Sequence, residues 1–432
     1  MAARFATLDA WLAWQEHLHP SAIDLGLERV RRVLEAMQLK PLTCPVVTVG
    51  GTNGKGSCVA LLESILRAQN LRVGAFTSPH LIRYNERIRI EGRAATDAEL
   101  MRAFERITDA RAGVSLTFFE YSTLAALELF AGTALDAVIL EVGLGGRLDA
   151  VNVVDPDVAL IVSVGLDHME WLGATRADIG REKAGILRAG RPAVLGSADM
   201  PDSVRAAARA LGAELIEPQR DFRWQRTGER WSWYGRSHSY VDLPPPALLG
   251  PRQFDNAAAV LAVLETLRLR LSIAPQAIAR GLESVDLPGR FQPVERDGVT
   301  WIVDVAHNAA AAETLALNLA ELPCAGRTVA VFGALKDKDV AAVVRAVAGQ
   351  IDEWFLATIS GERGLESGEV RRRAFGADAA RVTLAGVPPR VFDEVSQRVR
   401  RGDRVVVFGS FHMAGPALEW LRLYSRPLRS LR

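Results

Sequence analysis

The sequence has few cysteines and no long apolar run, and its charges nearly cancel. Its three cysteines, Cys44, Cys58 and Cys324, are widely spaced, so they form neither a CxxC pair nor a disulfide framework. This usage fits a reducing compartment, and we expect a cytoplasmic protein. No stretch of about 18 uninterrupted apolar residues exists and the first residues lack the apolar core of a secretion signal, so we expect no membrane span. The net charge of +1 offers no overall attraction for nucleic acid.

The composition and patterning that are present are those of a globular α/β protein. Hydrophobic residues make up 49% of the 432-residue chain and charged residues 24%, and the length suggests two domains. Short β-branched runs alternate with amphipathic stretches, which predicts mostly parallel sheets covered by helices. The expected strands include 46–49, 138–142, 158–164, 303–305, 328–332 and 404–408, and the expected helices include 58–69, 99–111 and 255–270. Thr96 and Glu99 form a capping-box pattern before the second of these helices.

Two segments interrupt the alternation. Residues 221–243 carry five Trp and Tyr side chains among polar residues, and we expect an antiparallel hairpin appended to the first domain. Such aromatics could stack on bases, but cross-strand packing is the favoured interpretation at this net charge. The Pro-Gly turn within 286–290 follows a helix and precedes new strands, so it predicts a linker. We therefore expect a domain at 1–288 and a smaller one at 289–432.

The strongest local signal is a glycine-rich turn between a buried strand and a helix, at residues 46–57. Its glycines let backbone N–H groups curl around phosphate oxygens, and the helix N-terminus adds partial positive charge. Lys55 supplies a point charge for the β- and γ-phosphates. The loop departs from the usual G-x-x-x-x-G-K-[ST] spacing, because Gly56 separates Lys55 from Ser57. A glycine turn with a surface lysine is the alternative.

Polar residues follow three expected strands, and they suggest a magnesium site. Ser78, Glu141 and His168 each come just after a strand, and ligands of open parallel sheets bind beyond the carboxyl ends of the strands. Oxygen ligands completed by water and ATP phosphates suit Mg²⁺. Taken singly, each of these residues is more often structural, and only their shared position favours a metal site.

Several motifs together resemble the dihydrofolate synthase/folylpolyglutamate synthase family of the Mur ligase superfamily. The phosphate loop has this superfamily's T-N-G-K-G-[ST] form, and the similarity continues in order through nearly the whole chain. The other matching segments are 23–29, 78–81, 119–121, 141–149, 180–186, 288–291, 304–308, 337–339 and 409–412. The resemblance implies a Mur-ligase-like P-loop ATPase domain followed by a smaller Rossmann-like domain.

By this resemblance, the nucleotide and metal residues can be assigned. The ATP-binding positions would be Asn53, Gly54, Lys55, Gly56, Ser57, Asn256, Arg290 and Asp304, and magnesium, as one or two ions, would be held by Ser78, Glu141 and His168. Lys55, Lys183 and His307 are the candidate catalytic residues. Lys183 matches a lysine that is carbamylated in the family, a change that replaces a cation with an anion. Without the resemblance, Lys183 would be interpreted as an ordinary solvated helix lysine.

The resemblance also implies a pterin site of the bacterial bifunctional type. Its positions are Ala22, Ile23, Asp24, Leu25, Phe119, Glu120, Tyr121, Ser122, Leu148, Asp149 and Ala150. Aromatic rings suit a flat heteroaromatic ligand, and carboxylates can pair with its amino-pyrimidine edge. Ser122 stands where glycine is common, a departure that affects substrate preference rather than fold.

The implied activity is an ATP-dependent ligase that joins L-glutamate to dihydropteroate and extends the glutamate tail of reduced folates through an acyl phosphate. Its partners would be these small molecules and ATP, with no nucleic acid and no membrane, and the family expectation is a monomer. The alternatives are a folylpolyglutamate synthase without the dihydropteroate activity, another Mur-type amino-acid ligase, and a nucleotide-driven switch. A phosphotransferase is disfavoured because its product would retain the phosphate.

Overall fold

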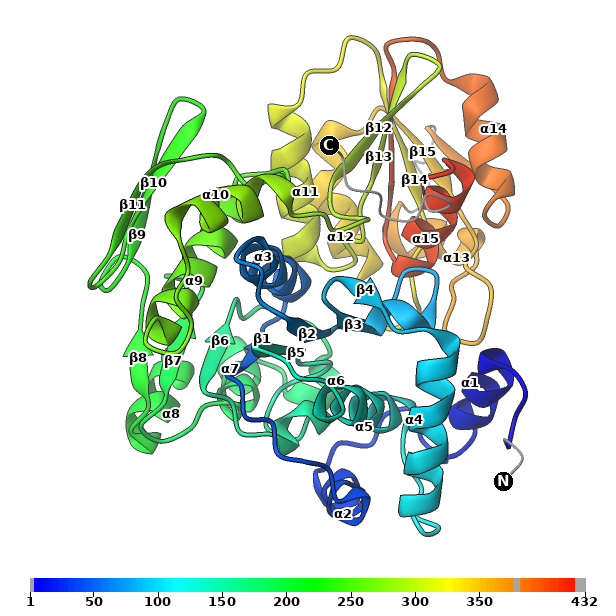
Figure 1. Ribbon diagram of the computed structural model, residues 1–432. Helices are drawn as coiled ribbons and strands as arrows, with labels where there is room; N and C mark the ends of the chain where they lie inside the picture. The colour runs from blue at the N-terminus through cyan, green and yellow to red at the C-terminus, as the bar shows by residue number, and fades with distance from the viewer. Residues whose placement is uncertain (1–3, 376–380, 424–432) are drawn as a thin grey trace. The chain divides into compact units, whose positions relative to one another are not determined.

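The computed structural model describes residues 4–375 and 381–423. The chain divides into two compact units (Figure 1), and each is described by itself. The first unit comprises Met1–Ala247 and Gln253–Asp286, and the second comprises Leu248–Arg252 and Leu287–Arg432. The chain therefore passes between the units three times, because the five residues Leu248–Arg252, which lead into a helix of the first unit, belong to the second.

An eight-stranded sheet forms the centre of the first unit, in the order β4-β3-β2-β5-β1-β6-β7-β8. The strands from β2 to β8 in this order are parallel, and only β3 and β4 at one edge are antiparallel. Its strands are β1 (Val46–Gly50), β2 (Val73–Phe76), β3 (Ile88–Ile90), β4 (Arg93–Ala94), β5 (Ala137–Glu141), β6 (Val158–Ile161), β7 (Pro192–Leu195) and β8 (Glu214–Ile216). Every residue of β1, β2, β5 and β6 is buried, as expected for a parallel sheet with both faces covered.

Helices cover this sheet, and local sequence signals set several of their starts. Thr96 and Thr117 begin α4 and α5 as capping boxes with Glu99 and Glu120, so the predicted box at Thr96 is confirmed. The helices of the unit are α1 (Leu8–Glu16), α2 (Glu28–Met37), α3 (Lys55–Ala68), α4 (Asp97–Ala110), α5 (Phe118–Ala131), α6 (Met169–Leu172), α7 (Arg176–Ala184), α8 (Asp202–Leu211), α9 (Arg252–Leu267) and α10 (Pro275–Ser284). Three short 3-10 helices, η1 (Tyr84–Arg87), η2 (Ala150–Val153) and, in the second unit, η3 (Ala348–Gln350), complete the helical elements.

The aromatic segment forms a three-stranded antiparallel sheet, one strand more than the predicted hairpin. Its strands are β9 (Arg223–Thr227), β10 (Arg230–Tyr234) and β11 (Ser239–Leu243), and it lies beside α9 (Figure 1). Trp231 and Trp233 are 1% and 0% exposed, and the indole N–H of Trp233 donates to the carbonyl of Ala258 in α9 at 3.0 Å. Trp233 also pairs across the strands with Tyr240, at a centroid distance of 5.7 Å. The packing interpretation is therefore confirmed for these rings, since buried rings cannot stack on bases.

The second unit is a six-stranded sheet with helices, in the order β12-β13-β17-β14-β15-β16. All of its neighbouring strands are parallel except β12 and β13. The elements are β12 (Gln292–Arg296), β13 (Val299–Val303), α11 (Ala309–Glu321), β14 (Thr328–Phe332), α12 (Val340–Val347), β15 (Glu353–Leu356), α13 (Ser367–Ala374), β16 (Val382–Leu384), α14 (Arg390–Arg398), β17 (Arg404–Phe408) and α15 (Phe411–Trp420). This arrangement is a Rossmann-like α/β architecture.

The predicted α/β fold is confirmed, while some boundaries differ. The predicted strand at 303–305 is wrong, because β13 ends at Val303 and the Asp304 carboxylate accepts backbone N–H bonds from Phe291 and Ala306 in the loop that follows. Likewise β6 ends at Ile161 instead of 164, since Ser163 bonds to the neighbouring loop.

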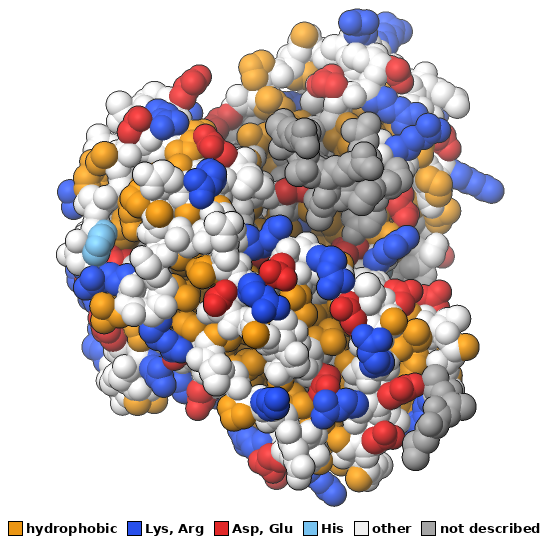
Figure 2. All heavy atoms as spheres, in the orientation of Figure 1, with side chains coloured by type: hydrophobic (Ala, Val, Ile, Leu, Met, Phe, Trp, Pro, Cys, Tyr) orange, Lys and Arg blue, Asp and Glu red, His pale blue; other side chains and the backbone are white. Residues whose placement is uncertain are grey.

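The surface carries charges of both signs. Figure 2 shows acidic and basic side chains interspersed over the face in view, in keeping with the net charge of +1. Within the part of the chain that the structure describes, no helix combines the length and apolarity needed to cross a membrane.

Trp233 gives a test of how the three-stranded sheet is held. Because its side chain is fully buried against α9, we expect Trp233→Ala to lower the free energy of unfolding by about 3–5 kcal/mol. The control is Val241→Ala in β11, whose residue is 67% exposed and which should change it by less than about 0.5 kcal/mol. Urea unfolding followed by circular dichroism measures both, and equal losses in the two variants would contradict the packing account.

Candidate functional site

The glycine-rich turn joins β1 to α3 at the carboxyl end of the first sheet. Gly51 and Gly54 have φ angles of 152° and 87°, and Gly54 is the residue before the first turn of α3. A Cβ on Gly54 would lie 2.8 Å from Val162 Cγ1 and 3.0 Å from Asn256 Oδ1, so only glycine fits. The helix begins at Lys55, and the backbone N–H groups of its first turn are those that an α-helix leaves without an internal partner. The geometry is that of an anion-binding helix start.

A serine that the sequence interpretation missed holds this turn. The Ser163 hydroxyl accepts from the Asn53 backbone N–H at 3.0 Å and donates to the Asn53 carbonyl at 2.9 Å. The Thr52 hydroxyl accepts from the Gly165 N–H at 2.9 Å and donates to its carbonyl at 3.2 Å. The loop after β6 therefore fixes the turn through two hydroxyls. The signal that could have indicated this role is the position of Ser163, a polar residue just after the buried strand β6.

Lys55 and Asn256 both lie at the turn. The Lys55 ammonium donates to the carbonyls of Gly51 and Thr52 at 2.9 and 3.2 Å, so the side chain folds back over its own loop. Asn256, in α9, is 8% exposed, and its amide donates to Gln253 Oε1 at 2.9 Å. Ser57 is buried in the first turn of α3.

Two of the three expected metal ligands meet at adjacent strands. The Ser78 backbone N–H donates to Glu141 Oε2 at 3.2 Å, and Glu141 is the buried last residue of β5. His168 follows β6 with a φ of 50°, and its backbone N–H donates to Asp167 Oδ1 at 2.9 Å. Within the described ranges, no three His, Cys, Asp or Glu side chains gather as a metal-binding group. The available set of a carboxylate, a hydroxyl and an imidazole suits an ion that takes its remaining ligands from phosphate and water.

Lys183 is buried, which contradicts the interpretation as a solvated helix lysine. It is 4% exposed near the end of α7. Burial lowers the pKa of its ammonium to about 7, helped by the charge of Lys55 and opposed by Asp167 and Asp149. Burial also raises the pKa of the Asp149 carboxyl to about 6, although the backbone N–H groups of Leu144 and Val151 donate to it. These interactions link the glycine-rich turn, through Lys55, to the loop after β5.

The expected pterin residues of α5 differ in burial, because Phe119 is partly exposed and Tyr121 lies in the core. Phe119 lies against Phe76 at a centroid distance of 5.7 Å and against Gly143, where a Cβ would lie 2.6 Å from the ring. Tyr121 is 0% exposed, and its hydroxyl donates to the Phe104 carbonyl at 2.8 Å. A direct ligand contact by Tyr121 would require its ring to leave this core.

Two of the remaining pterin positions, Asp24 and Glu120, pair with the same arginine. Glu120 is buried, caps α5, and lies 3.1 Å from the guanidinium of Arg29, which also pairs with Asp24 at 2.7 Å. Arg29, a residue that the sequence analysis gave no role, thus joins two predicted ligand segments. The Ser122 hydroxyl accepts from Tyr84 and donates to the Phe118 carbonyl, each at 2.8 Å. The other positions are Ala22, which is exposed, Ile23, Leu25 and Leu148, which are partly exposed, and Ala150, which is buried.

The candidates of the second unit gather where β13 ends. The Asp304 carboxylate accepts from the N–H groups of Phe291 and Ala306, both at 2.7 Å, and burial raises its pKa, opposed by the charge of Arg290. The Arg290 guanidinium lies 5.3 Å from the Phe411 ring centroid. The His307 Nδ1 lies 2.8 Å from the Val305 carbonyl oxygen, an arrangement that fixes the ring.

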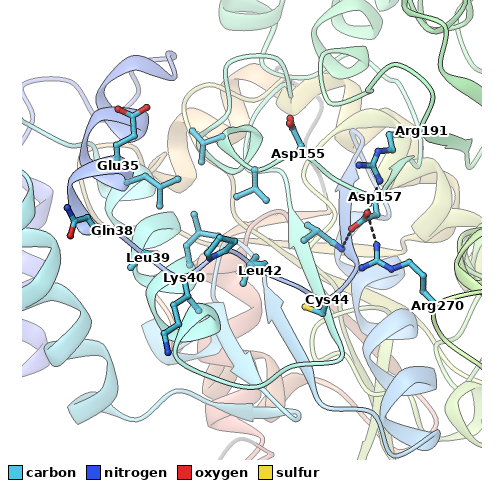
Figure 3. Close-up of a pocket in the computed structure, with 17 residues that line it drawn as sticks. Glu35, Gln38, Leu39, Lys40, Leu42, Cys44, Asp155, Asp157, Arg191 and Arg270 are labelled. Atoms are coloured by element: carbon cyan, nitrogen blue, oxygen red, sulfur yellow. Dashed lines mark hydrogen bonds and ion pairs between the residues drawn. The ribbon is translucent and has the colours of Figure 1, made fainter.

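A cavity of about 510 Å³ lies at the amino end of strand β1 in the first sheet (Figure 3). Its lining includes Val46, the first residue of β1, whereas the phosphate turn follows the last residue of that strand. Asp157 holds Arg191 and Arg270 there, each at 2.8 Å. The cavity therefore does not belong to the candidate site.

Comparisons with known proteins agree with this geometry. The family model "Mur ligase middle domain" matches residues 49–217, and "Mur ligase, glutamate ligase domain" matches 289–411. The dihydrofolate synthase/folylpolyglutamate synthase of Escherichia coli K12 is 42% identical over 413 residues, or 95% of each chain.

Solved structures are similar over the same extent. The Escherichia coli FolC structure in complex with DHPP and ADP is 40% identical, with a TM-score of 0.91 over 98% of this chain and 99% of that one. A bifunctional folylpolyglutamate synthase/dihydrofolate synthase with Mn, AMPPNP and L-glutamate bound is 43% identical, with a TM-score of 0.88 over 96% and 98% of the two chains. The chain therefore belongs to the Mur ligase family, among the dihydrofolate synthase/folylpolyglutamate synthases.

Proposed function

We propose that this protein joins L-glutamate to dihydropteroate and extends the glutamate tail of reduced folates, using ATP. The observation that carries the proposal is full-length similarity to a bifunctional enzyme, 42% identical over 95% of both chains. The phosphate turn, the Ser78–Glu141 pair and the buried Lys183 support it, because each suits a step of acyl activation by ATP. The reaction runs in the cytoplasm on small-molecule substrates, and the protein acts as a monomer.

The reaction divides into two transfers. In the first, a carboxylate oxygen of the acceptor attacks the γ-phosphorus of ATP, the bond to the bridging oxygen breaks, and ADP leaves. The backbone N–H groups of residues 54–57 hold the phosphates, and the Lys55 ammonium turns from its loop carbonyls to the developing charge. In the second, the glutamate amine attacks the acyl carbon, loses a proton and expels phosphate. No protein nucleophile is needed, so positioning and exclusion of water carry much of the rate.

Ser78, Glu141 and His168 would hold Mg²⁺, as one or two ions. When bound, the ion would neutralise the charge that builds on the phosphoryl oxygens. The protein's own contribution is to orient the carboxylate: the Ser78 N–H donates to Glu141 Oε2 at 3.2 Å, so one oxygen is fixed.

Lys183 in this proposal carries a carbamate, formed when its neutral amine attacks CO₂ and loses a proton. A carbamate needs an unprotonated amine, and burial brings the pKa of Lys183 to about 7. The resulting anion would replace a buried cation beside Lys55 and serve the metal or phosphate site. This change relieves the repulsion between two lysine ammonium groups.

The family resemblance also assigns nucleotide contacts to residues of the second unit. Arg290 would bind ATP phosphates, and Asp304 would contact the nucleotide after the rearrangement of the hydrogen bonds that now hold it. His307 would orient the substrates, since its ring is fixed through the Val305 carbonyl.

The pterin ring would bind near Phe119, the segment 22–25 and the loop 148–150. A folylpolyglutamate synthase without the dihydropteroate activity is the alternative that the same fold allows, and acceptor assays separate the two. If the protein were another Mur-type amino-acid ligase, neither dihydropteroate nor a folate would support glutamate-dependent ADP release.

We expect the purified protein with ATP and Mg²⁺ to release ADP only when both L-glutamate and an acceptor are present. Dihydropteroate and a reduced folate should each support turnover, because one site activates either carboxylate. Coupled ADP assays with each acceptor, and mass spectrometry of the products, measure this. Turnover of the folate alone would remove the first activity, and ADP release without any acceptor would favour a nucleotide-driven switch.

Gly54→Ala should weaken ADP binding by at least about tenfold, since a Cβ would meet Val162 and Asn256 at a φ of 87°. Gly190→Ala is the matched control, because Gly190 has a φ of 65° but no atom within 4 Å of a Cβ. Calorimetry with Mg²⁺ measures affinity, and thermal melting shows whether both variants fold. Unchanged affinity in Gly54→Ala would exclude this turn as the phosphate site.

The carbamate should form as pH rises through about 7, because the neutral fraction of the Lys183 amine rises there. With ¹³C-labelled bicarbonate, we expect a carbamate signal in the ¹³C spectrum at pH 8 that fades by pH 6. Lys183→Met should abolish the signal and the ligase activity, and Lys40→Met, at an exposed position, should preserve both. A signal that persists in Lys183→Met would assign the carbamate elsewhere.

A further inference from the structure

A short apolar segment lies next to the expected metal ligand His168. Leu166, Met169 and Trp171 are 52%, 46% and 41% exposed, and they are three of the ten large apolar side chains exposed among the described residues. Single exposed apolar residues are ordinary, but three within six positions call for a cause. The indole N–H of Trp171 donates to Glu170 Oε1 at 3.0 Å, which satisfies its polar edge.

The two ends of this segment are fixed to the candidate site. At one end, the Gly165 N–H donates to the hydroxyl of Thr52 in the phosphate turn at 2.9 Å. At the other end, the buried Leu172 packs on Gly145, where a Cβ would lie 2.8 Å from Leu172 Cδ2. Gly145 belongs to the loop after β5 that leads to the predicted pterin residues at 148–150. The segment therefore runs from the phosphate turn to the pterin side of the same unit.

A backbone hydrogen bond joins Trp171 to His168, the residue before α6. The backbone N–H of Trp171 donates to the His168 carbonyl at 3.0 Å, which closes one turn. The residue that carries the indole therefore lies within one hydrogen-bonded turn of the histidine expected at the reacting phosphoryl group.

The chemistry of the two acceptors differs at this point. In dihydropteroate the reacting carboxylate is bonded directly to a benzene ring, so that ring must lie within one ring's length of the phosphoryl group. In a folate, the reacting carboxylate ends a glutamate side chain, and the benzene ring lies several bonds away. An apolar platform beside the reaction centre therefore suits the first acceptor.

We propose that Trp171, with Met169 beside it, binds the benzoyl ring of dihydropteroate and so favours glutamate addition to that acceptor over elongation of folates. The proposal rests on the proposed ligase function. A planar aromatic contact of this kind is worth about a factor of ten in affinity. Trp171 acts as a substrate-binding and specificity-determining residue.

The test compares both acceptors in Trp171→Ala, Trp171→Phe and the control Leu211→Ala, whose residue in α8 is 42% exposed. For Trp171→Ala we expect kcat/KM for dihydropteroate to fall about tenfold through KM, while elongation of a reduced folate and the KM for ATP change less than twofold. Trp171→Phe should keep most of the activity and Leu211→Ala all of it. Thermal melting checks that every variant folds.

Each other result overturns the inference in a distinguishable way. An unchanged ratio of the two activities in Trp171→Ala, with active wild type, removes the inference and leaves the ligase function intact. If Trp171→Ala lowered kcat/KM equally for both acceptors and for ATP, the apolar segment would support the protein structure and would not bind the benzoyl ring. A wild-type protein that is inactive with both acceptors would remove the proposed function itself. A wild-type protein that only elongates folates would remove both the dihydropteroate activity and this inference.

Discussion

The hydroxyl of Ser163 is the contact on which the candidate site most depends. By bonding both backbone groups of Asn53, it ties the phosphate turn after β1 to the loop after the neighbouring strand β6. The turn is otherwise a run of glycine-rich backbone with little side chain to hold it, and flexible backbone binds phosphate poorly because ordering costs free energy. The order of the sheet makes this contact possible, since β6 pairs directly with β1.

The same strand order explains why residues distant in sequence gather at the carboxyl end of the sheet. Strands β2, β5, β1 and β6 are consecutive and parallel, so the residues after them leave the sheet at its carboxyl end. Ser78 and Glu141 meet there through a hydrogen bond, and Lys183 is buried where the charges of Lys55 and Asp149 reach it. The strand order thus places the candidate site residues together, and the cavity at the amino end of β1 takes no part in the site.

Periodicity and motif order predicted the α/β fold and the glycine-rich turn between β1 and α3, because buried strands and glycine turns have local signatures. The sequence could not reveal that Lys183 is buried, because a lone lysine in a helix looks the same whether solvated or enclosed. The sequence also did not distinguish Phe119, which packs against Gly143 in the loop after β5, from Tyr121, whose hydroxyl donates a hydrogen bond inside the core. Both residues are aromatic in one helix, and only tertiary packing decides which side chain faces outward. The strand predicted at 303–305 failed for a similar reason, since the Asp304 carboxylate satisfies loop N–H groups.

The path of the chain between its two compact units has a consequence for how such a protein can be divided. Residues Leu248–Arg252 belong to the second unit, although the segments on both sides of them belong to the first. A single cut after Asp286 would leave these five residues, with the buried Leu248 and the tightly packed Gly250, attached to the wrong half. Gene fusion or recombination at that junction would therefore not exchange the second unit intact.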